Sequence, residues 1–249
     1  IGTDIVAKSP GDGYTFLVVP APFTINPTLF GKLPYDALAD FTPVMLINTT
    51  PLVLVVNPRV PAGSVRELTA LARARPGTLN FGSSGTGGSN HLAGELYKSM
   101  AGLKIVHVPY KGNAPALTDL VGGHVDLVFN GLTSAIALIR GGKLKALAVT
   151  SAKRSSVLPE LPTMDEAGLK GFEATAWNGL AGPARVPREI VTRLQGEIVK
   201  ILANPEVRDR LRADGSDPVG NTPDEFARYL RTETEKWAKV IRFAGVKPE

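Results

Sequence analysis

The chain has 249 residues, of which 43 % are hydrophobic, enough for one large domain or two moderate ones with a packed core. Its net charge of +5 comes from Lys and Arg scattered among acids, and only 6 % of the residues are aromatic, which argues against nucleic-acid binding. The lack of cysteine excludes disulfides and thiolate catalysis, the three histidines lack metal-site spacing, and no apolar run is long enough to cross a bilayer.

The N-terminal part of the chain predicts alternating helices and strands. Residues 1–7 resemble the inside of a helix, and residues 14–19 form a strand that ends in the loop 20–24. A second strand is predicted over 51–57. It is followed by a helix over 64–75 that opens with Ser and Glu at capping-box spacing.

The middle of the chain alternates between strands and helices with unusual regularity. The predicted elements are strand 79–82, helix 89–100, strand 104–108, helix 113–121, strand 125–129, helix 133–140 and strand 144–149. Strands such as 125–129 are nearly continuous apolar runs, as expected for parallel strands buried on both faces. The block therefore predicts a doubly wound parallel sheet.

After this block comes a short strand, 177–183, and then helices dominate. They are predicted over 188–203, 205–213 and from a cap at 222 toward 243.

Two extended segments, 51–57 and 176–182, bracket the regular block, which predicts an inserted lobe tied to its neighbour by two strands. We therefore assign lobe 1 to 1–56 and 180–249, and lobe 2 to 57–179. A single continuous domain is the alternative.

The segment between the strand at 79–82 and the next helix is rich in glycine and hydroxyl residues. We call residues 83–89, Ser-Ser-Gly-Thr-Gly-Gly-Ser, the glycine loop. Its glycines let backbone N–H groups turn inward, and the helix that follows aims its unpaired N–H groups at the same point. Alternatively, these residues serve only as turn and N-cap residues before the helix. A helix needs only one capping residue, however, and this segment has many more. The loop therefore predicts an anion site.

Other candidate residues follow neighbouring strands. In open α/β sheets, ligands bind beyond the carboxyl ends of the strands. Tyr110 and Lys111 follow one strand and Asn130 follows the next. We expect them to converge on the edge that carries the glycine loop.

Familiar catalytic and cofactor motifs do not fit the glycine loop. It has no lysine for a P-loop, Asn90 stands at the third glycine position of a dinucleotide fingerprint, and no serine has the flanking glycines of a hydrolase elbow. We therefore predict binding without chemistry, with no catalytic residue, no metal and no cofactor. A small-molecule enzyme using His91 and Lys111 is the alternative.

Several motifs in their order along the chain resemble one receptor family. They are Val-Val-Pro at 18–20, Asn-Phe-Gly-Ser-Ser-Gly-Thr-Gly-Gly at 80–88, His-Val-Pro-Tyr-Lys-Gly at 107–112, Ala-Leu-Ala-Val-Thr-Ser at 146–151, Leu-Pro-Thr-Met at 161–164 and Trp-Asn-Gly at 177–179. Together they resemble the Bug-type solute receptors of tripartite tricarboxylate transporters. The resemblance implies a periplasmic receptor of the type II binding-protein fold, whose two α/β lobes close on a small carboxylate and pass it to a membrane permease.

The resemblance also implies a set of ligand-binding residues. The glycine loop looks like the family's carboxylate-holding loop. We add His91 as a candidate ligand-binding residue because it lies on the adjoining helix, close to the loop in the sequence. Ala21 and Phe23 would face the cleft from the other lobe. Asn130 stands where relatives often carry an aspartate. The loop positions carried over are Ser83, Ser84, Gly85, Thr86, Gly87 and Ser89.

The ligand is expected to be a dicarboxylate, a tricarboxylate or an amino acid, and the receptor to be a monomer. A sensor that presents its closed form to a signalling partner is the alternative. The family's first strand, helix and strand precede the segment that matches Ile1, and no signal peptide is present in the sequence. We expect these parts to lie upstream of it, and a damaged receptor that lacks them is the alternative.

Overall fold

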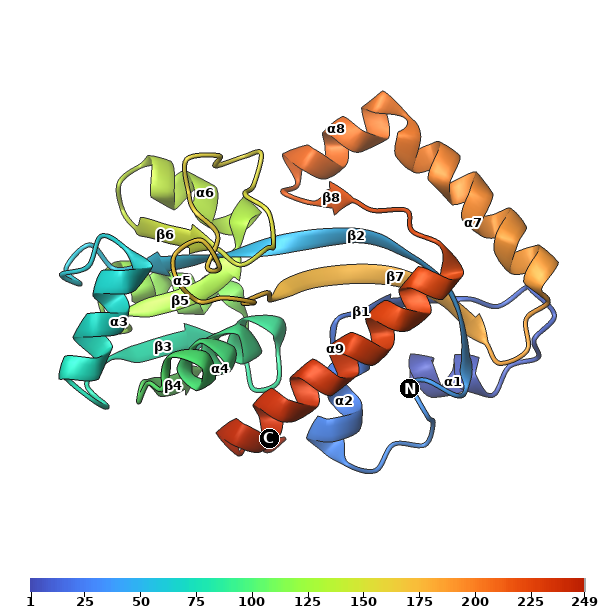
Figure 1. Ribbon diagram of the computed structural model, residues 1–249, viewed down its shortest axis with the longest axis horizontal. Coiled ribbons are helices and arrows are strands. Elements are labelled where there is room, and N and C mark those ends of the chain that lie inside the picture. The colour runs from blue at the N-terminus through green and yellow to red at the C-terminus, as the bar shows by residue number, and fades with distance from the viewer. Residues whose placement is uncertain (249) are drawn as a thin grey trace. The chain divides into compact units, whose positions relative to one another are not determined.

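The computed structural model describes residues 1–248 as a mixed α/β protein (Figure 1). Its helices are α1 (Gly2–Ala7), α2 (Pro22–Phe30), α3 (Val65–Ala74), α4 (Ser89–Ala101), α5 (Asn113–Gly122), α6 (Leu132–Arg140), α7 (Arg188–Ala203), α8 (Pro205–Ala213) and α9 (Pro223–Ala244). Its strands are β1 (Leu17–Pro20), β2 (Phe41–Val56), β3 (Asn80–Ser83), β4 (Val106–Pro109), β5 (Leu127–Gly131), β6 (Lys145–Val149), β7 (Thr175–Pro183) and β8 (Asp217–Pro218).

The chain divides into two compact units. Unit 1 comprises 1–49 and 176–239, and unit 2 comprises 50–175 and 240–249. Strands β2 and β7 carry the chain across the boundary, and α9 begins in unit 1 and ends in unit 2. The boundaries predicted from the sequence fall a few residues further along the same two strands, and the sequence placed all of the C-terminal segment in lobe 1.

Unit 1 is built on a sheet in which β7 lies between β1 and the first half of β2. β1 pairs antiparallel with β7, from Leu17 opposite Ala181 to Pro20 opposite Asn178. The short β8 pairs antiparallel with β2 at Asn48 and Thr49. One buried cluster joins the sheet to α2 and α9, and another joins it to α7.

Unit 2 is built on a sheet in the order β6, β2, β5, β3, β4. β3 pairs in parallel with β4 and with β5, whereas the second half of β2 is antiparallel to both β5 and β6. The four strands of the regular block thus run in one direction, as predicted, and β2 is inserted among them. Helices α5 and α6 contribute to the buried cluster on one face of this sheet.

Helix α4 packs tightly against β3, beside which it runs in Figure 1. A Cβ atom added at Gly94 in this helix would lie only 2.3 Å from the Phe81 ring on β3. Glycine therefore permits the close approach of helix and strand. On the same helix Tyr97 is fully buried, and its hydroxyl shares a hydrogen bond of 2.8 Å with Thr69 of α3. These contacts fix the helix whose N-terminus follows the glycine loop.

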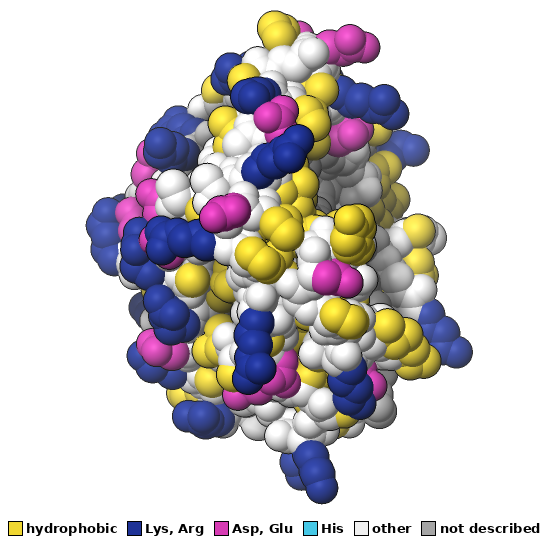
Figure 2. Space-filling view, turned by 90° about the vertical axis from the view of Figure 1, so that its right-hand side faces the viewer, with side chains coloured by type: hydrophobic (Ala, Val, Ile, Leu, Met, Phe, Trp, Pro, Cys, Tyr) yellow, Lys and Arg dark blue, Asp and Glu magenta, His cyan; other side chains and the backbone are white. Residues whose placement is uncertain are grey.

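On one face of the protein, charged side chains of both signs are mixed (Figure 2). On the face drawn in Figure 2, Lys and Arg lie among Asp, Glu and apolar side chains. Within the described residues, no helix is both long enough and apolar enough to cross a membrane.

Candidate functional site

The glycine loop forms the corner between β3 and α4. Gly85 and Gly87 have φ angles of +133° and +80°, a backbone region that side-chain-bearing residues rarely adopt. The N-cap of α4 is Gly88, so no side chain caps the helix, and its first turn contains no acidic residue. The N-terminal end of the α4 dipole is therefore not neutralised by either of the usual means.

The first-turn amides of α4 differ in what they contact. The His91 N–H donates to Oδ1 of Asn90 at 3.0 Å. The N–H groups of Ser89 and Asn90 come earlier in the helix. The carbonyl groups four residues before them lie outside the helix, so these two amides have no partner within it. These two amides are the natural donors for an anion at this corner.

Inside the loop, hydrogen bonds within unit 2 hold the backbone in place. The Gly87 N–H donates to Nδ1 of His91 at 3.0 Å, and the Gly85 N–H donates to Oγ of Ser83 at 3.2 Å. Ser84 donates its hydroxyl to Oδ1 of Asn90 at 3.0 Å. Three groups that the sequence assigned to the ligand are thus engaged within the protein.

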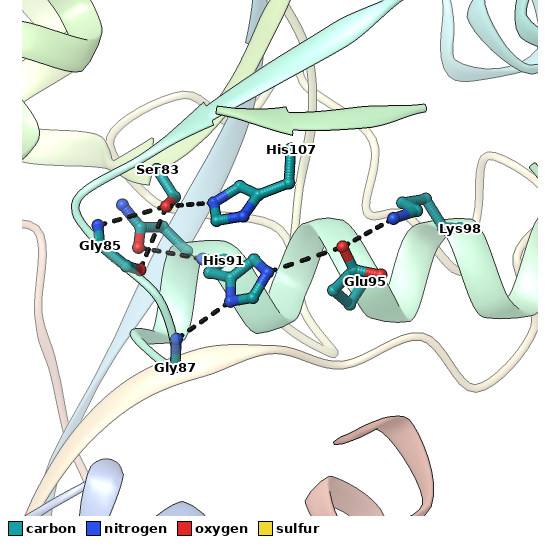
Figure 3. Close-up of polar contacts among 8 residues, drawn as sticks. Ser83, Gly85, Gly87, His91, Glu95, Lys98 and His107 are labelled. Atoms are coloured by element: carbon teal, nitrogen blue, oxygen red, sulfur yellow. Dashed lines mark hydrogen bonds and ion pairs between the residues drawn. The ribbon is translucent and has the colours of Figure 1, made fainter. Parts of the chain in front are cut away.

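Two histidines stack beneath the loop (Figure 3). The rings of His91 and His107 lie 3.8 Å apart between centroids with an interplanar angle of 17°. His107, on β4, shares a hydrogen bond of 2.6 Å between its Nε2 and Oγ of Ser83. The Phe81 ring lies 4.8 Å from the His107 ring, so the pair is embedded in apolar packing.

The charges next to this stack come from α4. Nε2 of His91 lies 3.6 Å from Oε1 of Glu95, and Nζ of Lys98 lies 2.7 Å from the same oxygen. Burial raises the pKa of Glu95, but its bonds to His91 and Lys98 outweigh this and bring the pKa below its usual value. Burial, aided by His91, lowers the pKa of His107 to about 4. The structure therefore favours the neutral form of His107 and the ionised form of Glu95.

The other predicted residues of unit 2 occupy three different environments. Asn130 is buried at the end of β5, where its Nδ2 donates to Oγ of Ser134 at 2.6 Å and its Oδ1 has no partner. Tyr110 is half-buried and donates its hydroxyl to Asp119 at 2.7 Å. Lys111 is exposed. Because β3 and β5 are parallel, the glycine loop and Asn130 do emerge at the same edge of the sheet.

The two residues predicted in the other lobe lie in the core of unit 1. Ala21 and Phe23 are only 3 % and 4 % exposed, and both belong to the apolar cluster that includes Trp177. The Phe23 ring packs edge-on against Phe41 with centroids 5.0 Å apart. Both side chains are thus accounted for by packing within their own unit.

Two residues of the site were not selected from the sequence. Asn90 is buried and accepts from Ser84 and the His91 N–H, while its Nδ2 donates to Asn113. His107 contacts the loop only because β4 pairs with β3, which places it opposite Phe81. The parallel pairing of the predicted strands was the signal that could have identified His107.

Two cavities in the described residues lie away from the glycine loop. One of about 540 Å³ in unit 1 is lined by residues such as Lys32 and Tyr35, and one of about 250 Å³ in unit 2 includes Arg59 and Arg75. The second also contacts Leu79 and so lies toward the amino end of β3, opposite the glycine loop. Within the described residues, His, Asp and Glu side chains form no cluster able to hold a metal ion.

Comparison with known proteins identifies the family. The model of the tripartite tricarboxylate transporter family receptor matches residues 1–246. The chain belongs to this receptor family. Its members are periplasmic solute-binding receptors and not enzymes, which confirms the family, the fold class and the absence of an enzymatic role predicted from the sequence.

Relatives match almost the whole chain. A UPF0065 protein from the tcbD-tcbE intergenic region of a Pseudomonas species is 41 % identical over 97 % of this chain and 72 % of its own length. Protein BugT of Bordetella pertussis is 37 % identical over 99 % of this chain and 76 % of its own length.

Solved structures share the fold. The R. palustris protein Rpa4515, solved with adipate, is 39 % identical with a TM-score of 0.83, and the match covers 99 % of this chain and 83 % of that one. MatC from Rhodopseudomonas palustris, solved with bound malate, is 31 % identical with a TM-score of 0.77, and the match covers 96 % and 83 % of the two chains.

The low pKa of His107 makes stability depend on pH. An unfolded imidazole takes up its proton near pH 6.5, whereas the folded one stays neutral until about pH 4, so the unfolded state binds more protons between these values. Acidification through this window should lower the free energy of unfolding, by on the order of 1 to 3 kcal/mol from His107. Urea unfolding from pH 7 to pH 4.5 should show this loss in the wild type and less of it in His107→Gln.

The matched control is His124→Gln, because His124 is exposed and lies away from the stack. This variant should follow the wild type at every pH. If the free energy of unfolding falls with pH equally in the wild type and in His107→Gln, the pKa of His107 is not depressed.

Proposed function

We propose that this chain is a periplasmic receptor that binds a small carboxylate at the glycine loop and delivers it to membrane permease subunits of a tripartite tricarboxylate transporter. The observation that carries the proposal is the first turn of α4. It has neither a capping side chain nor an acid, and its Ser89 and Asn90 amides precede the first intrahelical bonds. A carboxylate there would accept both N–H groups and interact favourably with the helix dipole.

The chemistry of the loop favours a carboxylate held by neutral donors. Residues 83–89 contain no Lys or Arg, so the charge of the ligand would be stabilised by amides and hydroxyls alone. Ser89 offers both an amide and a hydroxyl in the first turn. Several charge-assisted hydrogen bonds at such a site contribute about 1.5 to 3 kcal/mol each, which suits reversible capture by a transport receptor.

The relatives support a dicarboxylate. Rpa4515 was solved with adipate and MatC with malate, and both share the fold with this chain at more than 30 % identity. Two further solved structures similar to this chain are a periplasmic transporter and the periplasmic binding protein BugD. The similarity to these proteins supports the proposed periplasmic location of this chain and the proposed class of ligand, a dicarboxylate.

Ligand binding should stabilise the protein measurably. A carboxylate present at a hundred times its dissociation constant should add about 2.7 kcal/mol to the free energy of unfolding, or roughly 5 to 10 °C at this size. Thermal melts with adipate, malate, citrate and aspartate test this, and the uncharged adipamide is the control. We expect at least one acid to raise the melting temperature and adipamide to leave it unchanged. Flat melts across a wide panel of acids would contradict the proposal.

Substitution of Ser89 can separate the roles of its amide and its hydroxyl. Proline is tolerated at the first helical position, and Gly88, with φ −72° and ψ 161°, already has the extended backbone required before a proline. Ser89→Pro therefore removes the amide donor without breaking the helix. Ser89→Ala removes only the hydroxyl.

For the ligand found in the melts, calorimetry should show about fivefold weaker binding in Ser89→Ala, since one ordinary hydrogen bond is lost. Ser89→Pro should weaken binding at least a further tenfold, because an N–H bond to a charged oxygen is lost as well. Both variants should keep the far-UV circular dichroism of the wild type. Equal affinities in Ser89→Pro and Ser89→Ala would place the carboxylate elsewhere.

A further inference from the structure

We infer that His91 and His107 are positioning residues: their stacked rings hold the glycine loop in the conformation that presents the α4 amides to the ligand. The inference rests on the proposed function for its effect on binding. The hydrogen bonds that hold the loop lie within unit 2 and do not depend on a ligand.

His91 forms a hydrogen bond to the backbone of the glycine loop. Nδ1 of His91 accepts the Gly87 N–H at 3.0 Å, so Nδ1 must carry a lone pair and the ring hydrogen lies on Nε2. That nitrogen faces Oε1 of Glu95 at 3.6 Å, an acceptor suited to this tautomer. The Glu95 oxygen is in turn paired with Nζ of Lys98 at 2.7 Å. The hydrogen bond from Gly87 therefore sets the tautomer of His91, and the position of Glu95 is compatible with it.

His107 forms a hydrogen bond to the start of the glycine loop. Nε2 of His107 lies 2.6 Å from Oγ of Ser83, and the same hydroxyl contacts the Gly85 carbonyl and accepts its N–H. The two histidines thus hold the two loop glycines with positive φ, Gly87 directly and Gly85 through Ser83. Backbone in this region persists only where surrounding contacts hold it.

The side chain of His91 is buried. His91 is 3 % exposed and its two ring nitrogens are both engaged within unit 2, so its polar atoms are used in holding the loop. The charged groups facing the stack are Glu95 and Lys98 of α4, the latter 5.7 Å from the centroid of the Phe81 ring. Two imidazolium cations at a ring separation of 3.8 Å would repel each other. The stacked arrangement therefore disfavours a positive charge on both rings at once.

The test compares His91→Leu, which has no acceptor, with His91→Asn, whose Oδ1 can stand near the former position of Nδ1. In the ligand-free protein we expect amide exchange at Gly87 to accelerate at least tenfold in His91→Leu and to return to within threefold of the wild type in His91→Asn. Carboxylate affinity by calorimetry should fall at least tenfold and recover in parallel. His124→Leu, at an exposed histidine, is the control and should change neither quantity.

A measurement on the wild-type protein keeps the inference testable even where His91→Leu does not fold. Nitrogen chemical shifts of the imidazoles at pH 7 should show His91 as the tautomer with hydrogen on Nε2. The other tautomer, or a Gly87 amide that exchanges equally fast in the wild type and His91→Leu, would overturn the inference. If the wild type binds no carboxylate, the proposed function fails, whereas the tautomer and the exchange rates still decide the positioning role.

Discussion

A helix N-terminus without a cap is the feature on which the rest of this site depends. Ser, Thr, Asp and Asn are the preferred side chains for capping the first amides of a helix, as Ser64 does for α3 and Asn204 for α8. Helix α4 instead begins after Gly88, and its first turn carries no acid. Amides without a hydrogen-bond acceptor and an uncompensated helix dipole lower the stability of the protein by itself. The same features favour reversible binding of an anion. The lack of a cap on α4 is thus the local feature on which the proposed binding of a carboxylate depends.

The amides around α4 divide into two groups with different tasks. Those of Gly85 and Gly87 are bonded to Ser83 and His91 and hold the loop in shape. Those of Ser89 and Asn90 come later and belong to the helix end. The imidazole stack, the close approach at Gly94 and the buried Tyr97 all serve to keep the second group in place. A site built from backbone atoms needs this support because it has no long side chain to adjust its geometry.

The sequence predicted the regular part of unit 2 well, for a physical reason. Apolar strands alternate there with helices that end at glycines, so local pattern and tertiary structure agree. It missed most of β2, because Pro43 and Pro51 interrupt the strand pattern and a strand shared by two units has no single buried face. Within the candidate site, the sequence singled out the glycine loop, and its role in binding stays a prediction. His107 was not selected, because its role depends on strand pairing rather than on local spacing, and Ala21 and Phe23 lie in an apolar core that the loop 20–24 did not reveal.

The central claim is that the Ser89 and Asn90 amides bind the carboxylate. Titration of the ¹⁵N-labelled protein with the acid that stabilises it most, followed by amide chemical shifts, tests this directly. The account predicts that these two amide protons move furthest downfield, while the Gly87 amide keeps the shift of a group bonded to an imidazole. If the largest changes lie outside the first turn of α4 and these two resonances stay in place, the carboxylate is bound elsewhere and the account is wrong.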